Sequence, residues 1–198
     1  MYDYRKMTIA ERQELLRRRK LTGQPLHAPL HPDDGRVCFL ITAACHEHQC
    51  VLSSQARRGE FESKILTALR AIPETNVTAW VVLPNHYHVV IDADMGSLRQ
   101  TLARLHNGTS TQWNREDGTP GRRVWYRFRD DFLRDLDHYN QVLNYVHANP
   151  AKHGWVPKAI EWPTSSLRSC LETLGSDALR ENWWRFPIAK DFGKGWDD

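Results

Sequence analysis

The sequence lacks the segments that place a protein in or across a membrane. It contains no apolar run long enough to span a bilayer and no charged-then-apolar leader, so we expect neither a transmembrane helix nor a signal peptide. Internal repeats and low-complexity segments are also absent. Cysteine is scarce, and its residues follow no disulfide-framework spacing: Cys38, Cys45, Cys50 and Cys170. Together these absences favour a cytosolic protein with reduced thiols.

Positive charge is modest in total but concentrated in two places. The formal net charge is +3 over 198 residues. One cluster occupies residues 17–20, and the other consists of Arg122, Arg123, Arg127 and Arg129. The chain also has eight tryptophans, and cations interleaved with aromatic rings are typical of proteins that contact phosphates and stack on bases. For either cluster alone, a solvated helix face is the competing interpretation.

The hydrophobic pattern predicts a single α+β domain with terminal additions. Hydrophobic residues make up 40% of the chain, which is enough for one core. A capping box at Thr8 and Glu11 predicts a first helix that ends near Gly23. The other expected elements are strands over 36–44, 76–83, 86–92 and 124–128, and helices over 60–71, 97–113 and 137–149. This order is the ferredoxin-like pattern, a small antiparallel sheet with helices on one face.

The most informative stretch lies where two apolar runs flank Pro84 and Asn85. The second run opens with His86 and His88, which point to one face of a strand while Tyr87 points to the other. Two imidazoles on one face can form half of a metal site. A buried strand would not carry them for packing, since each ring needs a polar partner. The alternative is an ordinary pair of surface histidines.

A third metal ligand is expected on the helix over 137–149, which we predict to end before Pro150. Tyr145 and Asn149 are four residues apart and therefore share one face of that helix. A phenol oxygen and an amide oxygen could then face a common point beside the histidine strand. The spacing alone also allows Tyr145 to be a core residue and Asn149 a residue of the helix end.

Three stretches resemble the motifs of one known family. Residues 79–91 resemble the HUH strand of the REP-associated tyrosine transposases, domesticated relatives of the single-tyrosine transposases that move bacterial insertion sequences. Residues 145–156 resemble that family's nucleophile helix and the turn after it. Residues 161–166 resemble its Trp-Pro-x-Ser-Ser signature. The three motifs stand in the family's order and cover roughly residues 36–166, which makes them far more specific together than singly.

The resemblance also sets the expected domain boundaries. Residues 1–35 would form an N-terminal helix and linker, residues 36–166 an HUH transposase-like catalytic domain, and residues 167–198 a C-terminal tail. The motifs cover neither end of the chain. In the tail, Trp183, Trp184 and Phe186 suggest a segment that packs on the domain or reaches the DNA.

By this resemblance, Tyr145 is the nucleophile, and His86, His88 and Asn149 hold Mg²⁺ or Mn²⁺. Ligand type alone would also admit Zn²⁺, Co²⁺ or Ni²⁺. The implied reaction nicks and rejoins single-stranded DNA at hairpins of repetitive extragenic palindromes, through a 5′-phosphotyrosine that retains the phosphodiester energy. The resemblance further implies a monomer in the bacterial cytoplasm, associated with the nucleoid and without a membrane partner.

DNA recognition is expected to combine phosphate contacts with stacked, unpaired bases. The candidate DNA-binding residues are Arg122, Arg123, Arg127 and Arg129, with Lys152 and His153 beside the active helix. The basic run at 17–20 could clamp DNA or form a solvated face.

Two other functions stay open on the sequence. The first is a module of the same fold that grips a nucleic-acid hairpin without cutting it, for which Tyr145 would be dispensable. The second is a zinc protein that uses Cys45, His48 and Cys50, with His46 as a further ligand. Its Cys-x4-Cys spacing is unusual for a zinc finger, and no second cysteine pair completes four ligands.

Overall fold

The structure is a computed structural model that describes residues 38–193, 195 and 196. The helix expected over 8–23, the basic run at 17–20 and the segment assigned to 1–35 lie outside these residues. Within the described part, none of the helices combines the length and the apolar character needed to cross a bilayer.

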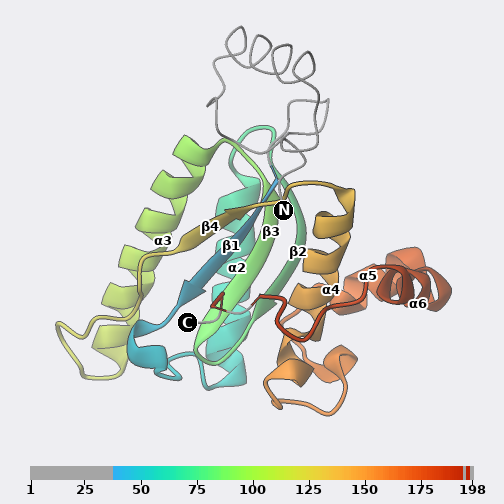
Figure 1. Ribbon diagram of the computed structural model, residues 1–198. Helices are drawn as coiled ribbons and strands as arrows, with labels where there is room; N and C mark the ends of the chain where they lie inside the picture. The colour runs from blue at the N-terminus through green and yellow to red at the C-terminus, as the bar shows by residue number, and fades with distance from the viewer. Residues whose placement is uncertain (1–37, 194, 197–198) are drawn as a thin grey trace, which may run out of the picture.

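Four strands form one antiparallel sheet in the order β2-β3-β1-β4 (Figure 1). The strands are β1 (Cys38–Ala44), β2 (Asn76–Val82), β3 (His86–Asp92) and β4 (Arg129–Phe132). Helix α2 (Gln55–Arg70) connects β1 to β2, and α3 (Met95–Glu116) connects β3 to β4. Because β3 lies between β1 and β2 and is antiparallel to both, the predicted ferredoxin-like α+β fold is confirmed.

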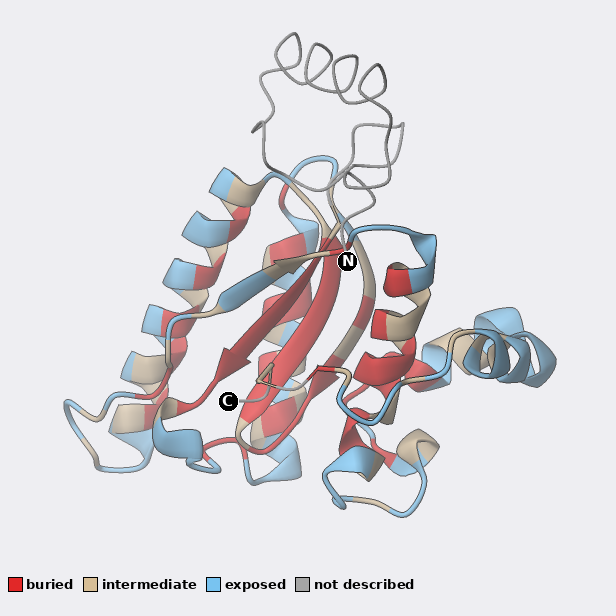
Figure 2. Ribbon diagram, in the orientation of Figure 1, coloured by how far each residue is buried: buried red, intermediate tan, exposed pale blue. Residues whose placement is uncertain are grey.

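Side chains of β1 alternate between two cores, one on each face of the sheet. Ile41 packs in the core that Phe61 of α2 shares, whereas Leu40 packs with Val142 of α4 (Leu136–Lys152). The helix layer predicted on one face consists of α2 and α3, and α4 covers the opposite face. Figure 2 shows β1 and β3 buried along nearly their whole length. The position of a residue in β3 therefore decides whether its side chain points towards α2 and α3 or towards α4.

The strand predicted over 124–128 is misplaced. Regular pairing with β1 begins at Arg129, where Thr42 is its partner, and before it only an isolated bridge joins Trp125 to Cys45. Between these two pairings, two residues of β1 thus oppose three residues of the other segment, which leaves one extra residue within 126–128. This bulge interrupts the ladder just where β1 gives way to the short 3-10 helix η2 (His46–His48).

The predicted end of helix α4 before Pro150 is wrong, because the helix continues to Lys152. The N–H of His153 then closes the last turn on the Asn149 carbonyl at 3.0 Å. Val142 and other apolar residues of α4 are buried against the sheet, and this packing outweighs the steric preference of the residue before proline. As a result, Lys152 belongs to the same helix as Tyr145.

The C-terminal part leaves the sheet and then returns to it. After the 3-10 helix η3 (Ala159–Glu161), helices α5 (Leu167–Leu174) and α6 (Ser176–Arg185) extend away from the domain, separated by Gly175 at a φ of 82° (Figure 1). The chain after α6 crosses the face of the sheet that α4 occupies. It reaches the edge strand, where Arg129 Nη1 donates a hydrogen bond to the Gly195 carbonyl at 3.0 Å.

Candidate active site

His86 and His88 lie side by side on the α4 face of the sheet. Both side chains are buried, and their ring centres are 5.0 Å apart with an interplanar angle of 76°. The register of β3 with β1 places Thr42 opposite His88. Tyr87 points the other way, into the core beneath α2 and α3, as the alternation of a strand predicts.

Each imidazole is oriented through its Nδ1 atom by a neighbouring oxygen. Nδ1 of His88 lies 2.8 Å from the Thr42 hydroxyl, and Nδ1 of His86 lies 2.9 Å from Oδ1 of Asn85. On its other side, Nε2 of His86 lies 3.2 Å from Oδ1 of Asn149 on α4. Fixing Nδ1 by a hydrogen bond is the usual way in which proteins prepare Nε2 to bind a metal ion.

A divalent cation fits this set of donors. A neutral imidazole carries one N–H, so His86, with an amide oxygen against each nitrogen, can donate to only one of them. A cation bound by Nε2 and by Oδ1 of Asn149 would remove the conflict, while Nδ1–H donates to Asn85. Among the described residues, no three His, Cys, Asp or Glu side chains form a metal site, so Asn149 is needed to complete the set.

The amide of Asn149 supports the same assignment. The residue is fully buried, and its Nδ2 atom has no hydrogen-bond partner within the described residues. A buried amide with one unsatisfied atom is costly, typically by about 1–3 kcal/mol. Packing alone therefore does not explain a buried amide at this position, next to His86.

Tyr145 lies next to the histidine pair. Its ring centre is 5.5 Å from that of His88, and the two rings are nearly perpendicular at 67°. The hydroxyl oxygen accepts a hydrogen bond from Nζ of Lys152 at 3.1 Å, and the same ammonium group lies 4.5 Å from the ring centre. Tyr145 and Asn149 therefore lie on one face of α4, as predicted, and this face contacts the strand that carries His86 and His88.

The C-terminal segment covers this tyrosine. Tyr145 is only 1% exposed, and the rings of Phe192 and Trp196 pack against it at 5.9 Å and 5.1 Å. Between them, Gly193 approaches so closely that a Cβ atom there would lie 2.9 Å from the hydroxyl oxygen. A phosphate cannot reach that oxygen unless the segment moves. No periodic pattern in the sequence points to these covering residues.

The tail aromatics singled out from the sequence lie elsewhere. Trp183 and Trp184 are both on α6 and are exposed to solvent, the second at 84%. Neither of them belongs to the two described cores. The aromatic residues of the tail that cover the candidate active site are instead Phe192 and Trp196.

The Trp-Pro-x-Ser-Ser stretch holds α4 and β2 together. Trp162 and Thr164 both donate hydrogen bonds to the Val82 carbonyl, at 2.9 Å and 2.8 Å. Ser166 accepts from the Trp80 N–H at 2.9 Å, and its hydroxyl also lies 2.9 Å from Nε2 of His147 on α4. The stretch therefore fixes the helix that carries Tyr145 against the sheet that carries the histidines.

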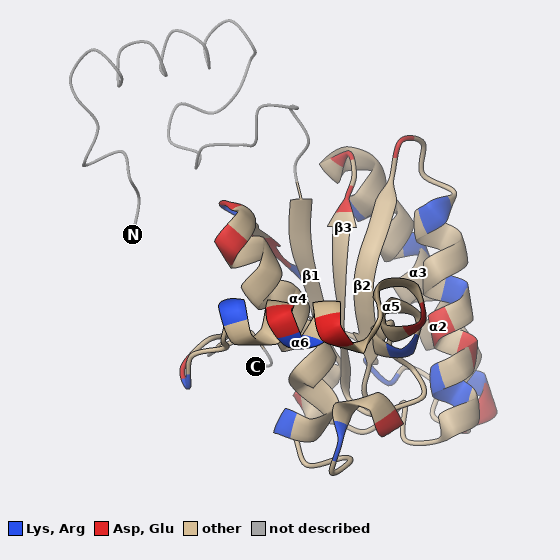
Figure 3. Cartoon of the chain, turned by 90° about the vertical axis from the view of Figure 1, so that its right-hand side faces the viewer, with Lys and Arg blue, Asp and Glu red and all other residues tan. Residues whose placement is uncertain are grey.

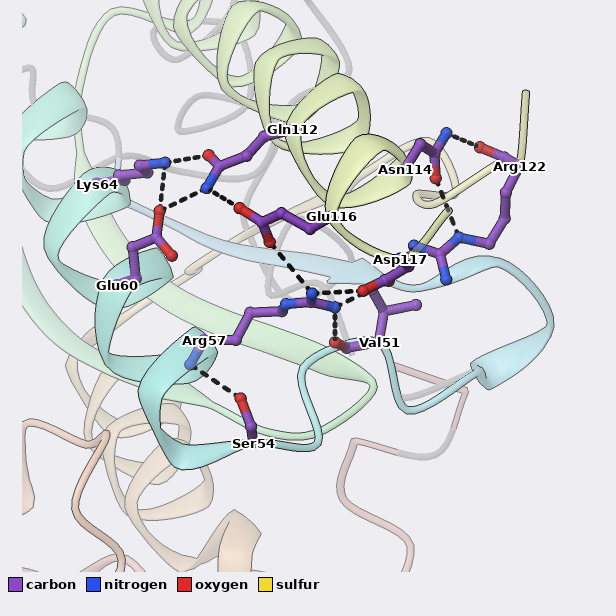
Figure 4. A network of polar contacts seen from close by, with 10 residues as sticks. All are labelled: Val51, Ser54, Arg57, Glu60, Lys64, Gln112, Asn114, Glu116, Asp117 and Arg122. Atoms are coloured by element: carbon purple, nitrogen blue, oxygen red, sulfur yellow. Dashed lines mark hydrogen bonds and ion pairs between the residues drawn. The ribbon is translucent and has the colours of Figure 1, made fainter. Parts of the chain in front are cut away.

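The four arginines expected to bind DNA fall into two classes. Arg122 pairs with Asp117 at 2.7 Å, and Asp117 also pairs with Arg57 of α2 at 2.6 Å (Figure 4). Hydrogen bonds from Arg57 and then Arg122 lower the pKa of Asp117 to about 2, so this network is charged over the physiological range. Arg129 pairs with Asp131 at 2.8 Å and reaches the tail.

Arg123 and Arg127 form the other class, because both are exposed on the segment before β4 and neither forms an ion pair with a described residue. The guanidinium of Arg123 lies over the ring of Tyr126, 5.3 Å from its centre. By contrast, basic and acidic residues are interspersed along α2, for example Lys64 and Glu60 (Figure 3). The α2 face therefore presents no surface of a single charge sign.

Lys152 and His153, also expected to bind DNA, lie at the candidate active site. Lys152 contacts the Tyr145 hydroxyl, and the ring of His153 is 5.1 Å from that of His86. Both residues are exposed to solvent. They extend the buried polar cluster towards the surface of the domain.

The structure does not assemble the alternative zinc site. Among the described residues, Cys45, His46, His48 and Cys50 form no group placed to bind a metal ion. Burial raises the pKa of the Cys45 thiol to about 12, which opposes the thiolate that zinc requires. Instead, the rings of His46 and His48 lie near Tyr126, at 4.9 Å and 6.3 Å.

Comparison with known proteins supports the predicted resemblance, although no family model matches the chain. It is 30% identical over 97 residues to the REP-associated tyrosine transposase of Escherichia coli (strain K12), an alignment that covers 46% of this chain and 53% of that protein. It is 28% identical over 147 residues to the putative REP-associated tyrosine transposase of Haemophilus influenzae, covering 66% and 78% of the two chains. The chain thus spans about half the length of its Escherichia coli relative.

A solved structure of a REP-associated tyrosine transposase bound to a REP hairpin has the same fold. The match has a TM-score of 0.55 and 22% sequence identity, and it covers 72% of this chain and 83% of the other. The resemblance read from the three motifs is confirmed by homologues of that name, and the architecture by this structural match.

Proposed function

We propose that this chain, a homologue of the REP-associated tyrosine transposases, is a metal-dependent endonuclease and strand transferase for single-stranded DNA. The observation that carries the proposal is the meeting of Tyr145 with His88 and of Asn149 with His86, across two elements far apart in sequence. Buried polar side chains that converge on one point are typical of an active site.

The proposed cofactor is Mg²⁺ or Mn²⁺, held by His86, His88 and Asn149. When bound, the ion would offset charge on the phosphate and orient it for attack. Two imidazoles and one amide oxygen suit such an ion and leave positions open for phosphate and water. Thr42 and Asn85 keep both rings in the orientation that this role requires.

In the proposed reaction, the hydroxyl oxygen of Tyr145 attacks a backbone phosphorus. The new O–P bond forms as the bond to the 3′ oxygen breaks, which gives a 5′-phosphotyrosine and a 3′-hydroxyl. The phenol proton passes to water, because a phenol with a pKa of about 10 is protonated at neutral pH, and the departing 3′ oxygen takes a proton from water. The ammonium group of Lys152, 3.1 Å away, stabilises the charge that develops on the oxygen.

A 3′-hydroxyl that attacks the intermediate would reverse this step and rejoin strands without ATP. The proposed substrate is a REP-type DNA hairpin, since the matching transposase structure is bound to one. We further propose that the protein acts as a monomer in the bacterial cytoplasm. Lys152 and His153, at the outer end of the site, would receive the phosphates that flank the scissile bond.

A hairpin-binding protein that does not cut is the second candidate. The burial of Tyr145 beneath Phe192, Gly193 and Trp196 favours it, because the hydroxyl is closed to DNA in this structure. The two candidates differ in one requirement. The enzyme needs the tail to move away, whereas the binding protein does not.

Incubation with labelled hairpin oligonucleotides and Mn²⁺ separates the two. The enzyme gives an adduct that survives SDS, and Tyr145→Phe abolishes the adduct but retains hairpin binding. Tyr139→Phe is the matched control, because this tyrosine lies on the same helix but its hydroxyl is hydrogen-bonded to Thr78 of β2. Hairpin binding without any adduct, also after the tail is displaced, would support the binding protein instead.

A further inference from the structure

A hydrogen bond connects the strand of the candidate metal ligands to a helix on the other side of the sheet. Tyr87 lies between His86 and His88 in β3 and projects into the core beneath α2 and α3. It is fully buried, and its hydroxyl oxygen lies 3.0 Å from Nε2 of His106 on α3. The position of β3 is therefore restrained from the face opposite to Tyr145.

The hydroxyl of Tyr87 does more than fill the core. The tyrosine ring packs against Phe61 of α2 and against Trp125, with ring centres 5.3 Å and 5.7 Å away, and phenylalanine would make the same ring contacts. A buried hydroxyl is unfavourable unless it is hydrogen-bonded. Once its partner is in place, such a buried polar pair specifies one arrangement of the elements that it joins. The pair thus fixes β3 relative to α3 in a way that apolar packing alone does not.

His106, the partner of this hydroxyl, is itself held in place. Its ring stacks on that of Trp125, with ring centres 4.7 Å apart and an interplanar angle of 18°. Nε1 of Trp125 donates a hydrogen bond at 3.0 Å to the hydroxyl of Thr109, which lies one turn after His106 on α3. Burial lowers the pKa of His106 to about 4, so at neutral pH its uncharged ring can accept the hydrogen bond from the phenol. We refer to Tyr87, His106, Thr109 and Trp125 as the Tyr87 network.

The Tyr87 network acts where the backbone pairing of β3 comes to an end. Tyr87 pairs with Ala43 of β1 and with Val82 of β2, whereas His86, one residue earlier, pairs with β1 alone. The ends of paired segments open more readily than their centres, because fewer contacts hold them. The contact with α3 therefore restrains β3 at the point where its backbone is held least.

The geometry of a strand couples Tyr87 to both histidines. Successive side chains project to opposite faces, so a rotation of β3 that shifts Tyr87 one way shifts His86 and His88 the other way. A functional site needs its side chains within about 0.5 Å and 10–20° of the productive geometry. Thr42 and Asn85 orient the two imidazole rings, whereas the Tyr87 hydroxyl restrains the strand from which the rings project.

We propose that His106 is a positioning residue for the candidate metal site, and that it acts through the Tyr87 hydroxyl on the strand that carries His86 and His88. The inference rests on the function proposed above, because it concerns the same site. Loss of the hydrogen bond would leave all three ligands present but hold two of them less precisely. Replacing an outer partner of a metal ligand typically lowers metal affinity by about 10–100-fold.

Calorimetric titration with Mn²⁺ in the absence of DNA tests this role. Tyr87→Phe removes the hydroxyl and keeps the ring, and His106→Leu removes the partner. Each is expected to weaken Mn²⁺ binding about tenfold. The double variant should bind no more weakly than either single variant, because both changes remove the same contact. His106→Gln can still form a hydrogen bond with the phenol and should retain most of the affinity.

Leu98→Val is the matched control for a loss of stability alone. Leu98 is buried in the same core, on α3 about two turns before His106. Its replacement should make the protein easier to unfold in urea and leave the affinity for Mn²⁺ unchanged. His106 is 9% exposed, at the edge of the core, so its variants keep the test valid even if Tyr87→Phe disturbs folding.

Three results would overturn the positioning role. They are an unchanged affinity in Tyr87→Phe and His106→Leu, an equal loss in Leu98→Val, and a loss in His106→Gln as large as in His106→Leu. The role is confirmed but the nuclease function is wrong if these variants lose Mn²⁺ affinity while the unchanged protein forms no Tyr145 adduct. The reverse holds if Tyr87→Phe forms the adduct with the same dependence on Mn²⁺ concentration as the unchanged protein. Failure of the unchanged protein to bind Mn²⁺ would contradict both.

Discussion

Gly193 lies against the ring of Tyr145 at a distance that only glycine permits. Its φ of +75° belongs to the left-handed region, and a Cβ atom there would overlap the tyrosine ring. The contact ties the end of the chain to the candidate nucleophile. It makes the accessibility of Tyr145 depend on one position 48 residues later in the sequence.

Gly193→Ala is expected to displace the segment over Tyr145 and to accelerate adduct formation. Strain at a positive φ costs about 1–3 kcal/mol, so the open population should rise roughly tenfold. The initial rate of adduct formation measures the effect, and hydrogen exchange at the Phe192 and Trp196 amides reports the opening without DNA. Gly118→Ala is the control, because it has a φ of +64° but open space around it. Slower adduct formation in Gly193→Ala, with faster exchange, would mean that the segment supports the site rather than covers it.

Lys152→Gln is expected to slow adduct formation roughly a hundredfold. The ammonium group is the donor to the Tyr145 oxygen, and removal of one such donor at a developing charge typically costs this much. Single-turnover rates at saturating DNA isolate this effect from binding. Lys152→Arg should retain much of the rate, and Lys158→Gln, an exposed lysine beyond α4, should match the unchanged protein. A loss confined to DNA affinity would assign Lys152 to binding alone.

Thr42→Val is expected to weaken Mn²⁺ binding about tenfold or more. The change keeps the shape of the side chain but removes the hydroxyl that orients His88 through Nδ1. Calorimetric titration with Mn²⁺ in the absence of DNA gives the affinity. Thr111→Val, on the exposed face of α3, should leave it unchanged. Equal affinity in the two variants would show that the His88 ring does not hold the ion.

Acid should destabilise the protein through His106. Burial lowers the pKa of this histidine from 6.5 to about 4, while its Nε2 atom lies 3.0 Å from the Tyr87 hydroxyl. Well above pH 6.5, His106 is neutral in both the folded and the unfolded chain, so it does not change the free energy of unfolding. As the pH falls from 6.5 to 4, the unfolded chain binds the proton and the folded one does not, so the free energy of unfolding falls by about 2 kcal/mol at pH 5.

Urea unfolding of His106→Gln at pH 7.5 and pH 5 checks this assignment. The variant should lose about 2 kcal/mol less between the two pH values than the unchanged protein does. His48→Gln, at an exposed histidine, should behave like the unchanged protein. Identical pH dependence in all three proteins would mean that His106 is not the group responsible.

The sequence predicted the elements that carry a strong local pattern. The strand His86–Asp92 was predicted with its observed bounds, because Pro84 and Asn85 interrupt the chain and the apolar run after them is continuous. The end of α4 was predicted wrongly, because a local rule about Pro150 competed with burial of the helix against the sheet. The fourth strand was displaced by a bulge that pairing with β1 imposes.

The residues that surround the candidate active site could not be predicted from sequence periodicity. The i, i+2 histidines and the i, i+4 Tyr145–Asn149 pair follow from strand and helix periodicity, which is why their juxtaposition was foreseeable. The cover formed by Phe192 and Trp196 depends on a loop path without periodicity. Likewise, the pairing of Arg122 with Asp117 depends on where a turn places two charges, which no spacing rule specifies.

Locating the covalent bond between protein and DNA would identify the nucleophile. Protein incubated with a REP-type hairpin and Mn²⁺ is digested, and the peptide that carries DNA is identified by mass spectrometry. We expect a 5′-phosphotyrosine at Tyr145, absent from Tyr145→Phe and more abundant in Gly193→Ala. An adduct at any other residue, or an undiminished adduct in Tyr145→Phe, would show that Tyr145 is not the nucleophile.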